Sequence, residues 1–205
     1  MNLAQNSEQS DTREFILEKA IHLFAGQGYS GVSMRNIAEM VGISPAALYH
    51  HFPSKQKLYL DTMQYAFADK STGIKEAINT TGTLSERLED FIRQFTKMVA
   101  ADQNFQRLMQ RELLDGDEAR LKLLAEHVFL DTYQSITELI NELATDWDAH
   151  MLISSIAGLV IHHYESNSMR QFLPGAKPEH NDPDVVASHV NRLFQQALQT
   201  SKREK

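Results

Sequence analysis

Apolar side chains recur every three or four positions along almost the whole chain, with polar side chains between them. This spacing places the apolar side chains on one side of an α-helix. No run shows the alternating pattern of valine, isoleucine and threonine that a half-buried strand needs. The pattern therefore predicts an all-α protein. Helices are expected over residues 12–27, 34–41, 45–51, 55–78, from 84 to at least 98, and over 103–114, 117–144, 146–172 and 183–200.

Several helix ends carry their own sequence signals. We expect Asp11 to cap the first helix, Phe15 to belong to its buried stripe, and Gly26 and Gly28 to end it. The run Thr-Leu-Ser-Glu at residues 83–86 has the form of a capping box. Residues 173–182, with their prolines and glycine, are expected to form the one long loop.

Two short predicted helices, residues 34–41 and 45–51, have the pattern of a helix-turn-helix. Ser33 is placed to cap the first of them, and Gly42 supplies a permissive turn residue. Ser44 then caps the second, with Pro45 at its first position, where a missing N–H costs nothing. The inner contact between the two helices is expected from Ile37, Ala38, Ile43 and Leu48. The outer face of the second helix is then free to enter a major groove.

Composition narrows the class of protein further. Of the 205 residues, 42% are hydrophobic and 8% aromatic, and no stretch of about 18 apolar residues occurs. The first residues, MNLAQNSEQSD, are polar where a signal peptide would be apolar. We therefore expect a soluble, cytoplasmic protein that does not associate with membranes. The chain has no cysteine, which excludes disulfides, thiolate metal sites and cysteine nucleophiles.

The distribution of charge matters more than its sum. A net charge of −7 argues against a surface coated with nucleic acid. Between residues 30 and 60, however, Glu39 is the only acid, while Arg35, Lys55 and Lys57 are basic. A small cationic face on an acidic body suits a protein that binds DNA at specific sites.

The spacing of residues around the motif is distinctive. It runs through Phe24, Gly28, Tyr29, Ser33, Met34, Ile37, Ala38, Gly42, Ile43, Ser44, Leu48, Tyr49, His51, Phe52, Lys55 and Leu58. In this spacing, over about the first 60 residues, the chain resembles the TetR family of bacterial transcriptional regulators. The resemblance implies a DNA-binding domain over residues 1–57, with a flexible N-terminal segment. It also implies a helical effector-binding and dimerisation domain over residues 58–205.

The same resemblance assigns DNA-contact roles by position. The implied contact residues are Ser33, Met34, Arg35, Ser44, Pro45, Ala46, Ala47, Tyr49, His50 and Lys55. Tyr49 and Lys55 would lie on phosphates, and Pro45, Ala46 and His50 nearest the bases. Met34 departs from the family pattern, in which a threonine is frequent and donates to phosphate. From the residues alone, Tyr49 could also pack its ring between helices.

The second domain is implied to bind an unidentified, mainly apolar small molecule. Its candidate lining residues are Phe91, Phe95, Met98, Phe105, Met109, Phe129 and Tyr133, with His163 as a polar partner. Packing in a helical core would explain the same apolar residues. Adjacent histidines point about 100° apart on a helix, so we expect no metal site, and nothing in the sequence indicates a cofactor.

The last two predicted helices carry apolar residues over a broad surface, which indicates a partner. The family dimerises through this pair of helices, so we expect a homodimer. The implied interface residues are Leu152, Ile156, Leu159, Val160, Val186, Val190, Leu193 and Phe194.

The predicted function is a ligand-responsive regulator, a repressor that a small effector releases from a palindromic operator in double-stranded DNA. No Ser-His-Asp constellation, P-loop or nucleotide-binding glycine motif occurs, so we expect no enzyme. The alternative is a helical adaptor whose N-terminal domain binds protein in place of DNA.

Overall fold

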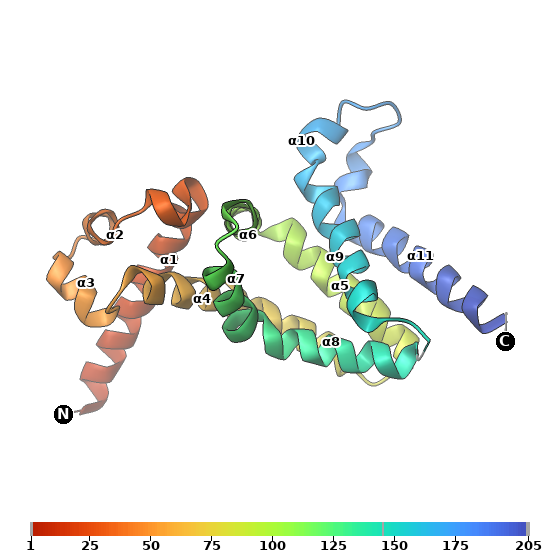
Figure 1. Cartoon of the computed structure of the whole chain (residues 1–205), viewed down its shortest axis with the longest axis horizontal. Coiled ribbons are helices and arrows are strands. Elements are labelled where there is room, and N and C mark those ends of the chain that lie inside the picture. The colour runs from red at the N-terminus through yellow and green to blue at the C-terminus, as the bar shows by residue number, and fades with distance from the viewer. Residues whose placement is uncertain (1, 145, 204–205) are drawn as a thin grey trace. The chain divides into compact units, whose positions relative to one another are not determined.

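The computed structural model describes residues 2–144 and 146–203, and side chains within 11–68, 70–144 and 146–198. All regular elements in these ranges are helices, as predicted (Figure 1). They are α1 (Asn2–Gly31), α2 (Met34–Val41), α3 (Pro45–His51), α4 (Lys55–Ile78), α5 (Leu84–Ala101), α6 (Gln103–Asp115), α7 (Glu118–Leu124), a π-helical turn η1 (Ala125–Phe129), α8 (Leu130–Leu143), α9 (Ala149–Glu165), α10 (Asn167–Arg170), a 3₁₀ turn η2 (Pro178–Asn181) and α11 (Pro183–Arg203). Across the described residues, none of these helices combines the length and apolar content needed to cross a membrane.

The first helix begins earlier than predicted. It begins at Asn2, so Asp11 is not its N-cap. Gly26 lies inside the helix, whereas a kink at Gly28 ends the regular stretch where the sequence predicted it, and a short helical segment follows as far as Gly31. Gly28 interrupts the helical backbone with a φ of 72° and a ψ of 173°, which only glycine adopts readily. Phe15 was wrongly expected inside. It is 43% exposed, and the Lys19 ammonium lies 5.1 Å from its ring centroid.

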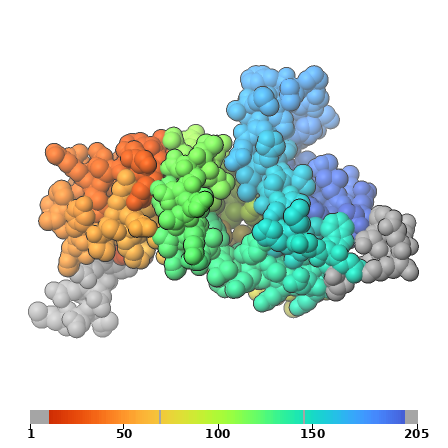
Figure 2. Space-filling view, viewed as in Figure 1, coloured from red at the N-terminus to blue at the C-terminus, as the bar shows by residue number. Residues whose placement is uncertain are grey.

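The two long predicted helices have different outcomes. The segment 117–144 is helical from Glu118 to Leu143, with the π-helical turn η1 inserted between α7 and α8. The segment 146–172 is divided, because α9 ends at Glu165 before the short α10. The predicted loop after α10 contains η2. Figure 2 shows that the stretch around α10 and this loop protrudes from the rest of its unit.

The chain folds into two compact units. Unit 1 contains the residues up to Asp69 together with Asn104–Leu130, and unit 2 contains Lys70–Gln103 with the residues from Asp131 onward. Helix α4 contributes its first part to unit 1 and its last part to unit 2. These units are defined by contacts within the structure, which do not test the predicted domain boundary after residue 57. That boundary stays a prediction.

Each unit has its own apolar core. Unit 1 buries side chains of α1 to α4 that include Ile16, Leu17, Ala20, Phe24, Ile37, Ala38, Leu48, Phe52, Leu58, Tyr59 and Met63. Unit 2 buries side chains of α5, α8, α9 and α11 that include Leu88, Phe91, Ile92, Ile136, Leu139, Ile140, Leu152, Ile156, Val160, Val186, Val190 and Phe194. Burial of this apolar surface is the main force that holds each set of helices together.

Candidate DNA-binding interface

Local hydrogen bonds fix the turn between α2 and α3. The Ser33 hydroxyl accepts from the Asn36 backbone N–H at 3.1 Å, and the Asn36 side-chain oxygen accepts from the Ser33 N–H at 3.0 Å. Gly42 ends α2 in the left-handed region with a φ of 80°, and its N–H donates to the Ala38 carbonyl at 2.9 Å. The Ser44 hydroxyl then accepts from the Ala47 N–H at 3.1 Å and caps α3. The predicted caps and turn are confirmed.

The inner faces of α2 and α3 meet as expected. Ile37, Ala38 and Leu48 are completely buried, and Ile43 is half-buried. Because alanine has only a methyl group at position 38, the two helices can approach closely. This contact orients the opposite face of α3 outward.

That opposite face of α3 is open to solvent. Ser44, Pro45, Ala46 and His50 are exposed, Ala47 is half-buried, and Tyr49 is 51% exposed. The ring of Tyr49 is therefore not enclosed between helices. Small apolar groups and hydrogen-bonding groups lie together on this face, which is the mixture that can meet base edges and phosphates.

The start of α2 contributes less than predicted. Ser33 and Arg35 are exposed, but the Met34 side chain is only 7% exposed. Met34 lies three and four positions before Ile37 and Ala38, so it shares their inward face. This burial argues against a DNA contact by the Met34 side chain, and the contact stays a prediction.

Acidic partners restrain several of the cations. The Arg35 guanidinium lies 2.9 Å from the Glu39 carboxylate. The buried Asp61 carboxylate accepts from the Lys57 ammonium at 2.7 Å and from the Arg13 guanidinium at 2.5 Å. The cationic character predicted from the sequence is therefore partly compensated within unit 1.

Lys55 has a different environment, because its ammonium lies over an aromatic ring. The Lys55 nitrogen is 4.3 Å from the centroid of the Tyr29 ring. Partial burial and the nearby positive charge of Arg120 lower the pKa of Lys55. The ring attracts the cation through its quadrupole and so restricts the directions the ammonium takes.

A cluster of buried charged residues also contacts Tyr29. The Arg120 guanidinium carbon is also 4.3 Å from the Tyr29 centroid, and its Nε donates to the Glu112 carboxylate at 2.7 Å. The Tyr59 hydroxyl donates to the second Glu112 oxygen at 2.8 Å. Burial and this hydrogen bond raise the pKa of Tyr59. Sequence reasoning missed this cluster, since no local pattern marks a glutamate and an arginine as buried partners.

The candidate effector residues are distributed over both units. In unit 1, the Phe67 ring packs against Phe105 at 5.9 Å and against Phe129 at 4.9 Å between centroids. In unit 2, Phe91 stacks on Phe95 at 5.9 Å. Met98 and Met109 are half-buried, one in each unit. These placements are those of packed side chains, and an effector role for any of them stays a proposal.

The polar candidates of unit 2 have protein partners. The Tyr133 hydroxyl is hydrogen-bonded to His150 Nδ1 at 2.5 Å. His163 Nε2 donates to the His180 carbonyl at 2.6 Å, and burial lowers the pKa of His163. Within the described ranges, no three histidine or acidic side chains gather in a way that could hold a metal ion.

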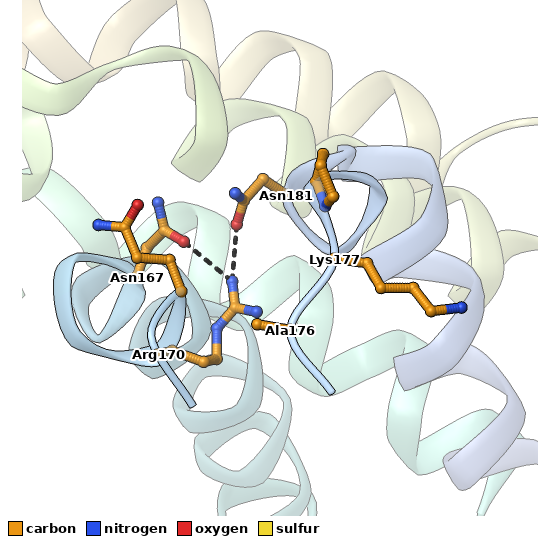
Figure 3. Close-up of a pocket in the computed structure, with 7 residues that line it drawn as sticks. Asn167, Arg170, Ala176, Lys177 and Asn181 are labelled. Carbon is orange, nitrogen blue, oxygen red and sulfur yellow. Dashed lines mark hydrogen bonds between the residues drawn. The ribbon is translucent and has the colours of Figure 1, made fainter. Parts of the chain in front are cut away.

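A polar pocket of about 330 Å³ opens beside α10 (Figure 3). Its lining residues are Asn167, Arg170, Gln171, Ala176, Lys177, Pro178 and Asn181. The Arg170 guanidinium donates to the side-chain oxygens of Asn167 and Asn181 at 3.2 and 2.6 Å. Figure 3 shows the Lys177 side chain pointing away from Arg170, so the two cations do not converge.

The predicted dimer residues divide by burial. Leu152, Ile156, Val160, Val186, Val190 and Phe194 lie in the core of unit 2, where side chains of the same protomer cover them. Leu159 and Leu193 are exposed, and Met151 and Val185 lie exposed on the same two helices. The amphipathic α5 packs against α9 and α11 and covers much of the apolar surface that the sequence analysis assigned to a partner. Any partner would meet the exposed set.

Comparison with known proteins agrees with this architecture. Residues 16–62 match the family model described as bacterial regulatory proteins, tetR family. Residues 84–201, more than half of the chain, match the C-terminal domain of the HTH-type transcriptional dual regulator CecR.

Individual relatives extend the match. The chain is 26% identical over 179 residues to the transcriptional activator FasR of Mycolicibacterium smegmatis, covering 86% of this chain and 79% of FasR. It is 31% identical over 138 residues to the transcriptional repressor AcnR of Corynebacterium diphtheriae, covering 63% and 72%. The crystal structure of AibR in complex with isovaleryl coenzyme A and operator DNA has a TM-score of 0.67 at 20% identity, covering 89% and 97%. At that identity the likeness shows the fold.

The capped helix pair, its open outer face and these matches define a helix-turn-helix transcriptional regulator that binds DNA. The chain belongs to the TetR family. The relatives FasR and AcnR are regulators of transcription.

Proposed function

We propose that two copies of this chain bind a near-palindromic operator and repress transcription, and that a small, mainly apolar effector releases them. The observation that carries this proposal is the open face of α3, held outward by the buried Leu48 and the Ser44 cap. Operator binding requires access to the chromosome, and the proposal therefore places the protein in the cytoplasm.

On DNA, Tyr49 and Lys55 would contact phosphates, while Pro45, Ala46 and His50 would lie nearest the bases. This face has few side chains that can form paired hydrogen bonds to one base. Part of the sequence preference would then come from DNA shape and deformability.

Fluorescence anisotropy tests operator binding. Duplexes selected from a random library should bind, and affinity should fall as salt rises, because phosphate contacts displace counterions. Tyr49→Ala and Lys55→Ala should each weaken binding about tenfold while dimerisation is retained. Lys122→Ala, which removes an exposed cation from α7, is the matched control and should bind normally. Unchanged DNA binding by the first two variants would favour the adaptor alternative.

The exposed apolar residues of α9 and α11 support the dimer. We propose that Met151, Leu159, Val185 and Leu193 meet their copies across a two-fold axis, because such an interface is self-complementary. The double variant Leu159→Glu/Leu193→Glu should be a monomer by light scattering. Leu114→Glu changes a leucine of α6 that is 80% exposed and should leave the mass unchanged. A dimer in the double variant would refute this interface.

We propose an effector with a short acyl chain. The apolar side chains among the candidates support an apolar group, and the isovaleryl coenzyme A bound to AibR suggests which one to test. Isovaleryl coenzyme A should weaken operator binding more than coenzyme A alone.

A promoter reporter tests the direction of regulation, since one relative is an activator and another a repressor. Loss of the regulator should raise expression, and lowered expression would contradict repression.

A further inference from the structure

Helix α7 carries a buried arginine that contacts the DNA-binding part of unit 1. Arg120 lies far along the chain from the helix-turn-helix, yet residues 104–130 belong to the same compact unit as α1 to α3. Its side chain is 8% exposed, and its guanidinium carbon lies 4.3 Å from the Tyr29 ring centroid. A residue of the effector region therefore contacts the end of α1 directly.

Tyr29 connects Arg120 to Lys55. The two cations lie at the same distance, 4.3 Å, from one aromatic ring. Each cation is attracted by the ring, and the two cations repel each other. Burial first, and the positive charge of Arg120 second, lower the pKa of Lys55. The position of the Lys55 ammonium thus depends on where the arginine lies.

Acidic groups hold Arg120 in place. Its Nε donates to the Glu112 carboxylate, which is 1% exposed and which also accepts from Tyr59. Its two terminal nitrogens lie 3.3 and 3.4 Å from Asp117 and Asp115. Since these acids lie on α6 and at the start of α7, a shift of either helix would carry the guanidinium with it.

We propose that Arg120 is a positioning residue for operator binding, which through Tyr29 directs the Lys55 ammonium toward the DNA backbone. The inference rests on the proposed phosphate contact of Lys55. It gives α6 and α7 a physical route to alter DNA affinity without moving the recognition helix α3. Its cation shares the Tyr29 ring with Lys55, the residue proposed to contact phosphate, which an ion pair confined to the core would not do.

A double-mutant cycle on the full-length dimer tests this role. Removing Arg120 alone would leave the Glu112 carboxylate buried without its partner. The cycle therefore replaces both residues in the paired variant Glu112→Gln/Arg120→Gln, whose amides can still hydrogen-bond. The matched control is Lys122→Gln/Glu126→Gln, which converts an exposed ion pair of the neighbouring turn to amides. Each pair is combined with Lys55→Ala.

The paired variant should lower affinity for the selected operator about three- to tenfold at low salt. The slope of log affinity against log salt should fall by about one, as in Lys55→Ala, because one phosphate contact is lost. In the Lys55→Ala background the paired variant should cause no further loss. The control pair should change neither quantity. Mere destabilisation would reduce the active fraction without changing the salt slope.

Equal losses with and without Lys55 would overturn the positioning role. Normal operator binding by Lys55→Ala would instead overturn the phosphate contact itself, and the inference with it. If the paired variant does not fold, Tyr29→Leu replaces it, because this half-buried ring is the link between the two cations. It should reproduce the loss of affinity and slope, and an unchanged slope would refute the link.

Discussion

Gly42 offers a direct test of how the helix-turn-helix is built. Its φ of 80° lies in the left-handed region, where a side chain strains the backbone. A Cβ at this position would have no heavy atom within 4 Å, so Gly42→Ala introduces no clash. The substitution therefore isolates the backbone cost of the turn.

The expected magnitude follows from two opposing contributions. Left-handed backbone costs alanine about 1–2 kcal/mol. Reduced freedom of the unfolded chain offsets about 0.4–1 kcal/mol of that cost. Gly42→Ala should thus lower the free energy of unfolding by about 1 kcal/mol, which corresponds to a melting temperature about 2–4 °C lower for a chain of this size.

Gly26 is the matched control in the same unit. It lies within α1 without a positive φ, and a Cβ there would also have no heavy atom within 4 Å. Gly26→Ala should raise the free energy of unfolding by about 0.5–1 kcal/mol, because alanine favours the helix. Urea and thermal unfolding followed by circular dichroism measure both variants. If Gly42→Ala is as stable as the wild type, or if both variants shift in the same direction, the reasoning about the turn is wrong.

Three further outcomes are expected. Ser44→Ala removes the acceptor for the Ala47 N–H and should cost about 1 kcal/mol in urea unfolding and weaken operator binding; an unchanged midpoint would contradict the cap. Tyr164→Phe removes a buried hydroxyl that has no hydrogen-bond partner in the described part of the chain, and it should raise stability by about 1 kcal/mol, so a lower melting temperature would refute that reading. Burial raises the pKa of Tyr164 from 10.0 to about 12, so the folded chain keeps a proton that the unfolded chain releases above pH 10, and stability falls as pH rises from 10 toward 12. Between pH 10 and 12 the free energy of unfolding should fall more steeply for the wild type than for Tyr164→Phe. Parallel pH profiles would contradict the raised pKa of Tyr164.

Cap and turn chemistry made the local structure predictable. Ser33, Gly42, Ser44 and Thr83 each form the cap or turn that their residue types indicate, because the donors and acceptors involved lie within four residues. Local chemistry also led to the error at the start of α1. Asp11 has the right side chain for a cap, but the helix extends beyond it on the N-terminal side.

Burial was only partly predictable. The helical period shows that Leu152 and Leu159 are apolar positions of one helix, yet it does not show which neighbour covers each side. Leu152 is buried in the core of unit 2, while Leu159 stays exposed. Met34 illustrates the same limit, since a position that the family assigns to DNA carries a side chain turned toward the core.

The sequence by itself determined the all-helical fold, the helix-turn-helix and the outward side chains of α3, because these depend on short-range periodicity and capping. Only the tertiary structure brought Glu112 and Arg120 to Tyr59 and Tyr29, across 53 positions between Tyr59 and Glu112. Ion pairs and ring contacts between distant segments leave no periodic pattern in a sequence. They form where packing removes charged groups from water, because each charged group then has only its neighbours in the fold as partners.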